Sequence, residues 1–262
     1  MNNRIVNTFS ELKKNEKKAL IAFITGGDPD IETTEKLILA MEEAGVDLIE
    51  IGIPFSDPVA EGVVIQEADA RALAGGCTVD KLFDMVKRLR EKTDIPLLFM
   101  TYANPIYAYD KERFMAKCKE VGIDGIVVPD MPFEEKDEFE DACSRSDICF
   151  ISLIAPTSGK RAEEIALEAQ GFLYCVSSLG VTGTRNEINT NIAELIRQVK
   201  QVSSIPCAVG FGISTPQQAR DMAEISDGVI VGSAIVKLVA EFGRDSVAPI
   251  KRFVGNMKNS LK

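Results

Sequence analysis

Two carboxylates stand close together in the chain but in contrasting surroundings. Glu50 lies inside the apolar run 48–53, and Glu61 follows it on a loop punctuated by proline and glycine. A charge in a buried strand is costly unless it is paired, hydrogen-bonded or neutralised. The two environments therefore favour a protonated Glu50 and an ionised Glu61, which is how two carboxylates divide acid and base roles at neutral pH. Alternatively, Glu50 caps a neighbouring backbone group and Glu61 is a solvated loop residue.

The chain contains no histidine, and this absence narrows the possible chemistry. It excludes Ser–His and Cys–His nucleophile pairs, an imidazole base and a zinc site that contains histidine. Proton transfer must then fall to carboxylates, lysine, tyrosine or cysteine. We expect an acid–base site that uses carboxylates and no metal.

The composition indicates a cytoplasmic protein with a small-molecule partner. Forty acidic and 30 basic residues give a net charge of −10, which argues against nucleic acid or an anionic membrane as the main partner. No apolar run approaches a membrane span, and the N-terminus leads into no signal-peptide apolar region. The six cysteines are scattered without a Cys-x-x-Cys pair, as expected of buried, reduced thiols.

Short apolar, β-branched runs alternate with amphipathic segments along the whole chain. The runs are continuous rather than alternating in polarity, which is typical of parallel strands covered on both faces. The expected strands span 19–25, 48–53, 96–102, 125–129, 149–155, 172–177, 207–211 and 228–232.

The segments between these runs carry helix signals. Thr78 and Asp110 can cap helices, and Gly122 can end the second of them. Upstream of the first run, Ile5 and Phe9 indicate a short amphipathic helix that could close the bottom of a barrel.

Eight strand–helix units in 262 residues predict an α/β protein, a (β/α)₈ TIM barrel with an extra N-terminal helix and a single domain over 1–262. A doubly wound sheet is the alternative. It is less favoured because the chain shows no linker between lobes and no Gly-x-Gly-x-x-Gly after the first strand.

In such a barrel, function lies on the loops that follow the strands. The loop 54–62 is long for this type of connection, which favours a functional role. Glycine-bearing turns follow strands six, seven and eight, at 180–183, 210–214 and 232–234. Backbone amides in such turns, with a helix beginning at Ser233, could hold a phosphate. Alternatively, they are ordinary strand-to-helix turns.

Several large side chains fall at or near strand ends. They could line an apolar pocket for an aromatic substrate, although each could equally be ordinary barrel core. These residues are Phe23, Met100, Tyr102, Ile154 and Tyr174.

Three strings, at 50–58, 180–183 and 209–213, resemble the alpha subunits of tryptophan synthase, and the resemblance covers essentially the whole chain. It implies a (β/α)₈ barrel that reversibly cleaves indole-3-glycerol phosphate, by a retro-aldol reaction, to indole and glyceraldehyde 3-phosphate. It also implies an allosteric α₂β₂ heterotetramer whose beta subunit uses the indole. Pyridoxal phosphate is expected only in that partner, and no cofactor in this chain.

The resemblance assigns roles residue by residue. It implies catalysis by Glu50 and Glu61. The phosphate-binding positions are Gly183, Phe211, Gly212, Gly232 and Ser233, and the substrate-binding positions are Phe23, Tyr102, Tyr174 and Thr182. Two residues depart from the family pattern: Glu61 stands where Asp is usual, and Val63 stands where Pro is usual. These changes put the rate in doubt rather than the reaction.

Two other functions remain open from the sequence. The chain could serve mainly as an allosteric activator of its partner, with weak chemistry of its own. It could also be a different phosphate-binding barrel of the same pathway that acts on a ribulose-phosphate compound.

Overall fold

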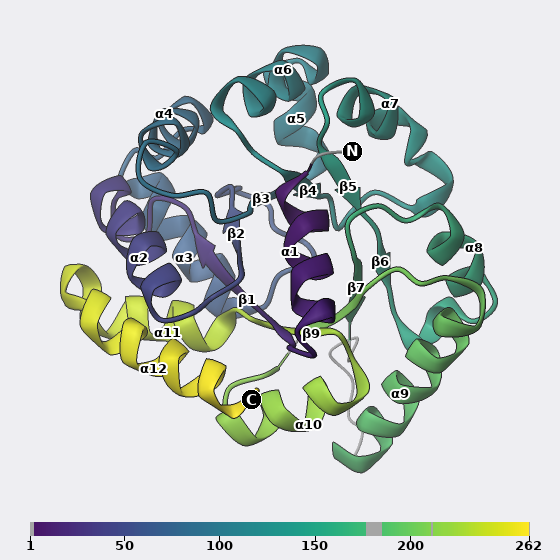
Figure 1. Cartoon of the computed structure of the whole chain (residues 1–262). Coiled ribbons are helices and arrows are strands. Elements are labelled where there is room, and N and C mark those ends of the chain that lie inside the picture. The colour runs from purple at the N-terminus through teal and green to yellow at the C-terminus, as the bar shows by residue number, and fades with distance from the viewer. Residues whose placement is uncertain (1–2, 177–184, 211, 262) are drawn as a thin grey trace.

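A ring of parallel strands surrounded by helices forms the protein (Figure 1). The computed structural model describes residues 3–176, 185–210 and 212–261. The helices are α1 (Arg4–Lys14), α2 (Ile31–Glu43), α3 (Val63–Ala74), α4 (Val79–Leu89), α5 (Ala103–Tyr109), α6 (Lys111–Val121), α7 (Asp137–Arg145), α8 (Arg161–Glu168), α9 (Arg185–Val202), α10 (Pro216–Ile225), α11 (Ser233–Phe242) and α12 (Val247–Ser260). The strands are β1 (Ala19–Thr25), β2 (Leu48–Gly52), β3 (Leu97–Met100), β4 (Gly125–Val127), β5 (Cys149–Ile151), β6 (Leu153–Ile154), β7 (Leu173–Val176), β8 (Cys207–Gly210) and β9 (Gly228–Val231).

The strands follow the order β5-β4-β3-β2-β1-β9-β8-β7-β6, and all recorded pairings are parallel. The expected strand 149–155 is divided at Ser152, because β5 pairs with β4 while β6 pairs with β7. Strands tilt in a closed barrel, so one strand can meet its two neighbours along different stretches. The ring therefore closes through this segment, and the predicted TIM barrel is confirmed.

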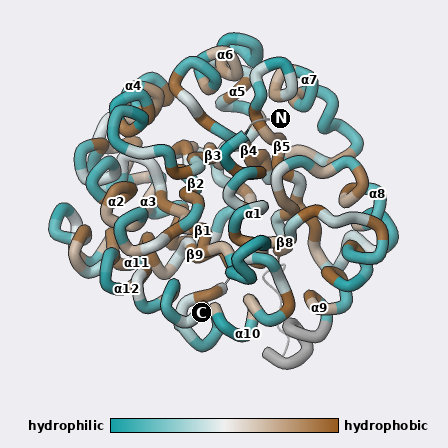
Figure 2. Tube along the Cα trace, viewed as in Figure 1, coloured by the Kyte–Doolittle hydropathy of each residue, from teal (hydrophilic) through white to brown (hydrophobic). Residues whose placement is uncertain are grey.

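The interior of the barrel is filled by alternate strand residues, as the two-residue repeat of a strand requires. Ile21 and Leu48 point inward and share a buried cluster with Ile5 and Phe9 of α1. Intervening residues such as Ile49 belong to a larger cluster between the strands and the helices. Figure 2 shows the result, with hydrophobic residues along the strands and hydrophilic residues on the outer helix faces. No described helix is both long and apolar enough to cross a membrane.

Local helix signals predicted from the sequence are confirmed. The Thr78 side chain accepts the backbone N–H of Lys81 at the start of α4, and the Asp110 side chain accepts that of Arg113 at the start of α6. Gly122 ends α6 in the left-handed conformation, with φ of 86°, where a side chain would be strained.

Helix α1 closes one end of the barrel, as its apolar spacing predicts, and lies across the centre of the ring in Figure 1. Asn3 caps it by accepting the backbone N–H of Ile5 at 2.9 Å. Ile5 and Phe9 are buried, and the Phe9 ring lies 5.4 Å from that of Phe172, centroid to centroid. The helix therefore acts as an apolar plug.

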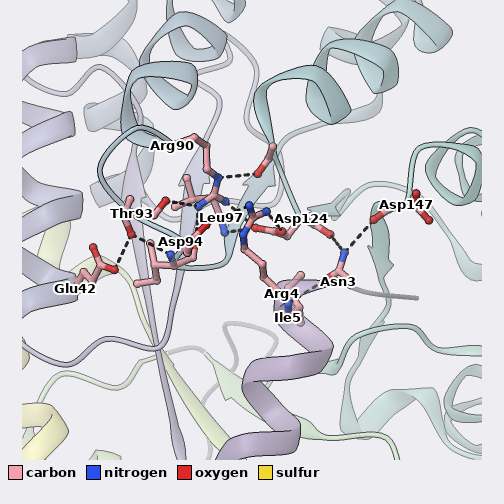
Figure 3. Close-up of polar contacts among 12 residues, drawn as sticks. Asn3, Arg4, Ile5, Glu42, Arg90, Thr93, Asp94, Leu97, Asp124 and Asp147 are labelled. Atoms are coloured by element: carbon pink, nitrogen blue, oxygen red, sulfur yellow. Dashed lines mark hydrogen bonds and ion pairs between the residues drawn. The ribbon is translucent and has the colours of Figure 1, made fainter.

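A buried carboxylate ties this plug to the strands (Figure 3). One oxygen of Asp124 accepts from the Arg4 guanidinium at 3.0 Å. The other accepts from Arg90 at 2.8 Å and from the backbone N–H of Leu97 at 2.9 Å. The Asn3 side-chain amide donates to the Asp124 carbonyl at 2.8 Å. Asp124 thus joins α1 to the entries of β3 and β4.

We expect Asp124→Ala to lower the free energy of unfolding by about 3 kcal/mol, because it leaves the buried Arg90 guanidinium without its carboxylate. Asp94→Ala is the matched control. It removes the other carboxylate near Arg4. The Asp94 side chain is 94% exposed, against 5% for that of Asp124, so its loss should lower the free energy of unfolding by less than about 1 kcal/mol. Urea denaturation of both variants measures the difference. Equal losses would show that burial does not set the strength of this cluster.

Candidate active site

Glu50 points into the barrel from β2. It shares the inward face with Leu48 and lies in register with Phe23 of β1 and Leu98 of β3. Its side chain is fully buried, and neither carboxyl oxygen has a hydrogen-bond partner among the described residues. Burial raises the pKa of Glu50 to about 8, with a further contribution from the charge of Glu61. The described part of the chain thus gives no support to a capping role for Glu50.

Glu61 reaches the same region from the loop after β2. It is half-buried and lines a cavity. Burial raises the pKa of Glu61 as well, so its surroundings are drier than the expected wet loop. Glu50 is the more deeply buried of the two and its pKa is raised further by the charge of Glu61. Glu61 is therefore the carboxylate that ionises first, as the sequence predicts.

The cavity lies at the carboxyl ends of the strands, where barrel sites are found. Its volume is about 340 Å³. It brings together six of the predicted site residues, and its lining comprises Phe23, Glu61, Gly62, Ile65, Met100, Tyr174, Gly212, Ile213, Ser214, Ile230, Gly232, Ser233, Ala234 and Lys237. Thr182, Gly183 and Phe211 lie outside the described residues.

Two glycines make room for the rings at the cavity. A Cβ on Gly52 would lie 2.7 Å from the Phe23 ring, and one on Gly210 would lie 2.7 Å from the Tyr174 ring. Neither distance is sterically allowed, so any side chain at these inward positions would push the rings away. The pKa of Tyr174 is raised by burial and by the charges of Glu50 and Glu61. This ring is therefore a neighbour of both acids.

Tyr102 and Ile154 lie outside the lining of the cavity. Tyr102 is not among the lining residues, because β3 ends at Met100 and Tyr102 is the residue that precedes α5. Its hydroxyl accepts the backbone N–H of Ala60 at 2.9 Å. Ile154 belongs to the buried cluster between the strands and the helices, which agrees with the alternative that it is ordinary core.

One end of the cavity has features that suit an anion. Gly212, Gly232 and Ser233 meet there, and α11 begins at Ser233, which directs free backbone N–H groups and a positive dipole end toward it. Gly212 has φ of +81° and open space where a Cβ would be. Lys237, which was not predicted from the sequence, also lines the cavity. Its position four residues after Ser233, on the same face of a helix, could have indicated it.

A third carboxyl group, not indicated by the sequence, lies near Glu61. Asp69 is 5% exposed on the inner face of α3. Burial raises the pKa of Asp69 to about 7, against the effect of a hydrogen bond from the Phe55 backbone N–H, and the charges of Glu61 and Asp28 raise it further. An isolated acid within a helix pattern resembles a solvated residue, so no sequence signal distinguished it.

The comparisons with known proteins agree on one family. The sequence profile described as tryptophan synthase alpha chain matches residues 9–262. The tryptophan synthase alpha chain of Caldanaerobacter subterraneus subsp. tengcongensis is 47% identical over 261 residues, which is 99% of this chain and 100% of the relative. That of Halalkalibacterium halodurans is 48% identical over 255 residues, 94% of this chain and 96% of the relative.

Solved structures give the same result. The tryptophan synthase subunit alpha from Legionella pneumophila str. Paris superposes with a TM-score of 0.91 at 36% identity, covering 100% of this chain and 99% of that chain. A chain of the tryptophan synthase complex from Pyrococcus furiosus superposes with a TM-score of 0.84 at 37% identity, covering 92% and 98%. Fold, cavity and sequence therefore place this chain in the tryptophan synthase alpha chain family.

Proposed function

We propose that this chain is a carbon–carbon lyase that cleaves indole-3-glycerol phosphate to indole and glyceraldehyde 3-phosphate. The observation that carries the proposal is Glu50, an inward carboxyl group without a described hydrogen-bond partner, whose pKa burial raises to about 8. Such a group holds a proton at neutral pH and can transfer it. Membership of the alpha chain family supplies the substrate.

Glu50 is the proposed proton donor and acceptor. Its carboxyl proton passes to indole C3, which leaves a cation over C2 and N1. The bond between C3 and the glycerol carbon then breaks, and its electron pair restores the indole ring. The glycerol hydroxyl returns its proton to the Glu50 carboxylate as the aldehyde forms. One group thus completes the cycle without a net loss of protons.

Glu61 is the proposed partner of the indole nitrogen. As C3 gains a proton, positive charge develops at N1, and a carboxylate that accepts the N–H hydrogen bond is drawn to it more strongly. Because this charge appears mainly in the transition state, the contact lowers the barrier more than it tightens substrate binding. Phe23 and Tyr174 line the cavity and are proposed to contact the aromatic and glycerol parts.

The phosphate is proposed to bind at the opposite end of the cavity. Gly212, Gly232 and Ser233 would supply backbone N–H groups, together with Gly183 and Phe211 outside the described residues. Lys237 adds a positive charge. It lines the cavity and forms no ion pair within the described part of the chain.

We further propose that the chain works with a beta subunit in an α₂β₂ heterotetramer that receives the indole, and that pyridoxal phosphate is held by that partner only. The likeness to a chain of the Pyrococcus furiosus tryptophan synthase complex supports a partner. All six cysteines are buried thiols outside any disulfide, which suits the predicted cytoplasmic location.

Removal of the proton donor should stop the reaction. We expect Glu50→Gln to lower indole release by at least about 10³-fold, since the amide cannot transfer a proton at neutral pH. Binding of a beta subunit should be unchanged, which serves as the test of folding. A variant that still cleaves at the parent rate would refute the assignment. A parent chain that releases no indole but converts a ribulose-phosphate compound would instead support another barrel enzyme.

The pH profile should report the buried acid. Free enzyme needs Glu50 protonated, and the pKa of this group is about 8, so kcat/KM for indole release should fall about tenfold per pH unit above pH 8. In Glu61→Gln the repulsion is lost, and the remaining activity should start to fall at a lower pH. An alkaline limb that does not move in this variant would show that the two acids do not interact.

A substitution at the proposed phosphate site should change substrate binding rather than the rate of the chemical step. We expect Lys237→Gln to raise KM about fivefold, the value of one partly exposed charged contact, while kcat stays within about twofold. Lys36→Gln is the control, because Lys36 is an exposed lysine paired with Glu32 and does not line the cavity. An unchanged KM in Lys237→Gln would remove Lys237 from the phosphate site.

A further inference from the structure

The loop 54–62, called here the Glu61 loop, needs support along its length. Before it begins, the Ile53 backbone N–H donates to the Met100 carbonyl at 2.8 Å. At its far end, the Gln66 side-chain amide donates to the Glu61 carbonyl at 2.8 Å. Between these points the loop projects into solvent, and Val59 is 82% exposed. The position of the Glu61 carboxylate therefore depends on what holds the middle of the loop.

Tyr102 provides one such contact. It is buried, and its hydroxyl accepts the backbone N–H of Ala60, the residue next to Glu61, at 2.9 Å. Its ring lies 5.3 Å from the Phe55 ring, centroid to centroid. The pKa of Tyr102 is raised by burial and then by the charges of Glu61 and Asp69. Tyr102 is therefore a neighbour of both carboxyl groups, outside the lining of the cavity.

Asp69, on α3, lies near the same loop. The other buried residues of α3 are apolar, so a carboxyl group on this face is costly unless it forms a specific contact. The backbone N–H of Phe55 and the Thr25 hydroxyl both lie close enough to the Asp69 carboxyl group to lower its pKa. Asp69 is therefore placed beside the first part of the Glu61 loop.

Helix α3 is itself fixed, so that Asp69 is presented from a rigid element. Arg71 donates to both carboxylate oxygens of Asp28, at 2.9 and 2.8 Å. Asp28 is 2% exposed. Because Arg71 is paired with Asp28, it does not pair with Asp69, and within the described part of the chain Asp69 forms no ion pair that would compete with the loop backbone.

We propose that Asp69 and Tyr102 are positioning residues that hold the Glu61 loop at Phe55 and Ala60 and thereby fix the Glu61 carboxylate against the substrate. This inference rests on the proposed function, because it concerns the same reaction. Neither residue touches the reacting atoms. Displacing a catalytic group by about 1 Å can lower the rate about 10²-fold, so the contacts that these two residues make with the loop matter beyond their own strength.

The test compares variants by kcat and KM for indole release, with the full chain and a beta subunit. Asp69→Ala removes the acceptor, and Tyr102→Phe removes the hydroxyl but keeps the ring. Each should lower kcat about tenfold or more and change KM less than about threefold, since the Glu61 contact strengthens in the transition state. Asp69→Asn keeps an oxygen acceptor and should bring kcat back to within about threefold of the parent. Glu67→Ala, which removes an exposed carboxylate from the same helix, is the control.

A second comparison, between the parent chain and a variant that lacks Glu61, distinguishes positioning of Glu61 from a purely structural role. In a Glu61→Ala background the contact to be positioned is already gone, so Asp69→Ala and Tyr102→Phe should each lower kcat by less than about threefold further. Equal factors in both backgrounds would overturn the proposal. An Asp69→Asn variant as impaired as Asp69→Ala would overturn the role of Asp69.

Hydrogen exchange separates this proposal from the proposed function. Asp69→Ala should speed amide exchange at Phe55, and Tyr102→Phe should speed it at Ala60, whether or not the chain cleaves indole-3-glycerol phosphate. Unchanged exchange at both amides would overturn the anchoring. Faster exchange in a parent chain that releases no indole would support the anchoring and refute only the reaction.

Discussion

A carboxyl group is confined inside the barrel with no described hydrogen-bond partner, and the rest of the site follows from this constraint. Glu50 is fully buried, and low polarity penalises its charged form. A lone acid in this place would only reduce stability. Burial makes Glu50 a group that keeps its proton at neutral pH, and the charge of Glu61 adds to this effect.

The barrel divides its interior into two ends with different tasks. At one end, α1 inserts Ile5 and Phe9 among inward strand residues, and Asp124 binds the helix to β3 and β4. The packing of α1 closes this end. At the other end, Gly52 and Gly210 carry no side chain where the Phe23 and Tyr174 rings need space. The buried carboxyl groups thus lie at the end of the barrel where glycines leave space, and the well-packed end that α1 closes lies beneath them.

Features that depend on local rules could be predicted from the sequence. Continuous apolar runs identified the strands because both faces of a parallel sheet are covered, and the two-residue repeat placed Glu50 on the same face as Leu48. The division at Ser152 could not be predicted, since it depends on how the ring closes. Tyr102 points to the Glu61 loop because β3 ends two residues before it, and strand ends depend on tertiary pairing. The position of Asp69 beside that loop could not be predicted either, because it depends on how α3 packs in the folded protein.

The distribution of charge in the cavity also sets the direction in which a substrate can bind. Glu61, whose charge acts on the buried acid Glu50, lines the same cavity as Lys237, Gly212, Gly232 and the start of α11. A ligand with an aromatic group at one end and a phosphate at the other gains attraction in one orientation. In the reversed orientation the phosphate would meet the Glu61 carboxylate, and like charges at short range are costly when water is excluded. Specificity for orientation then comes from repulsion as much as from attraction.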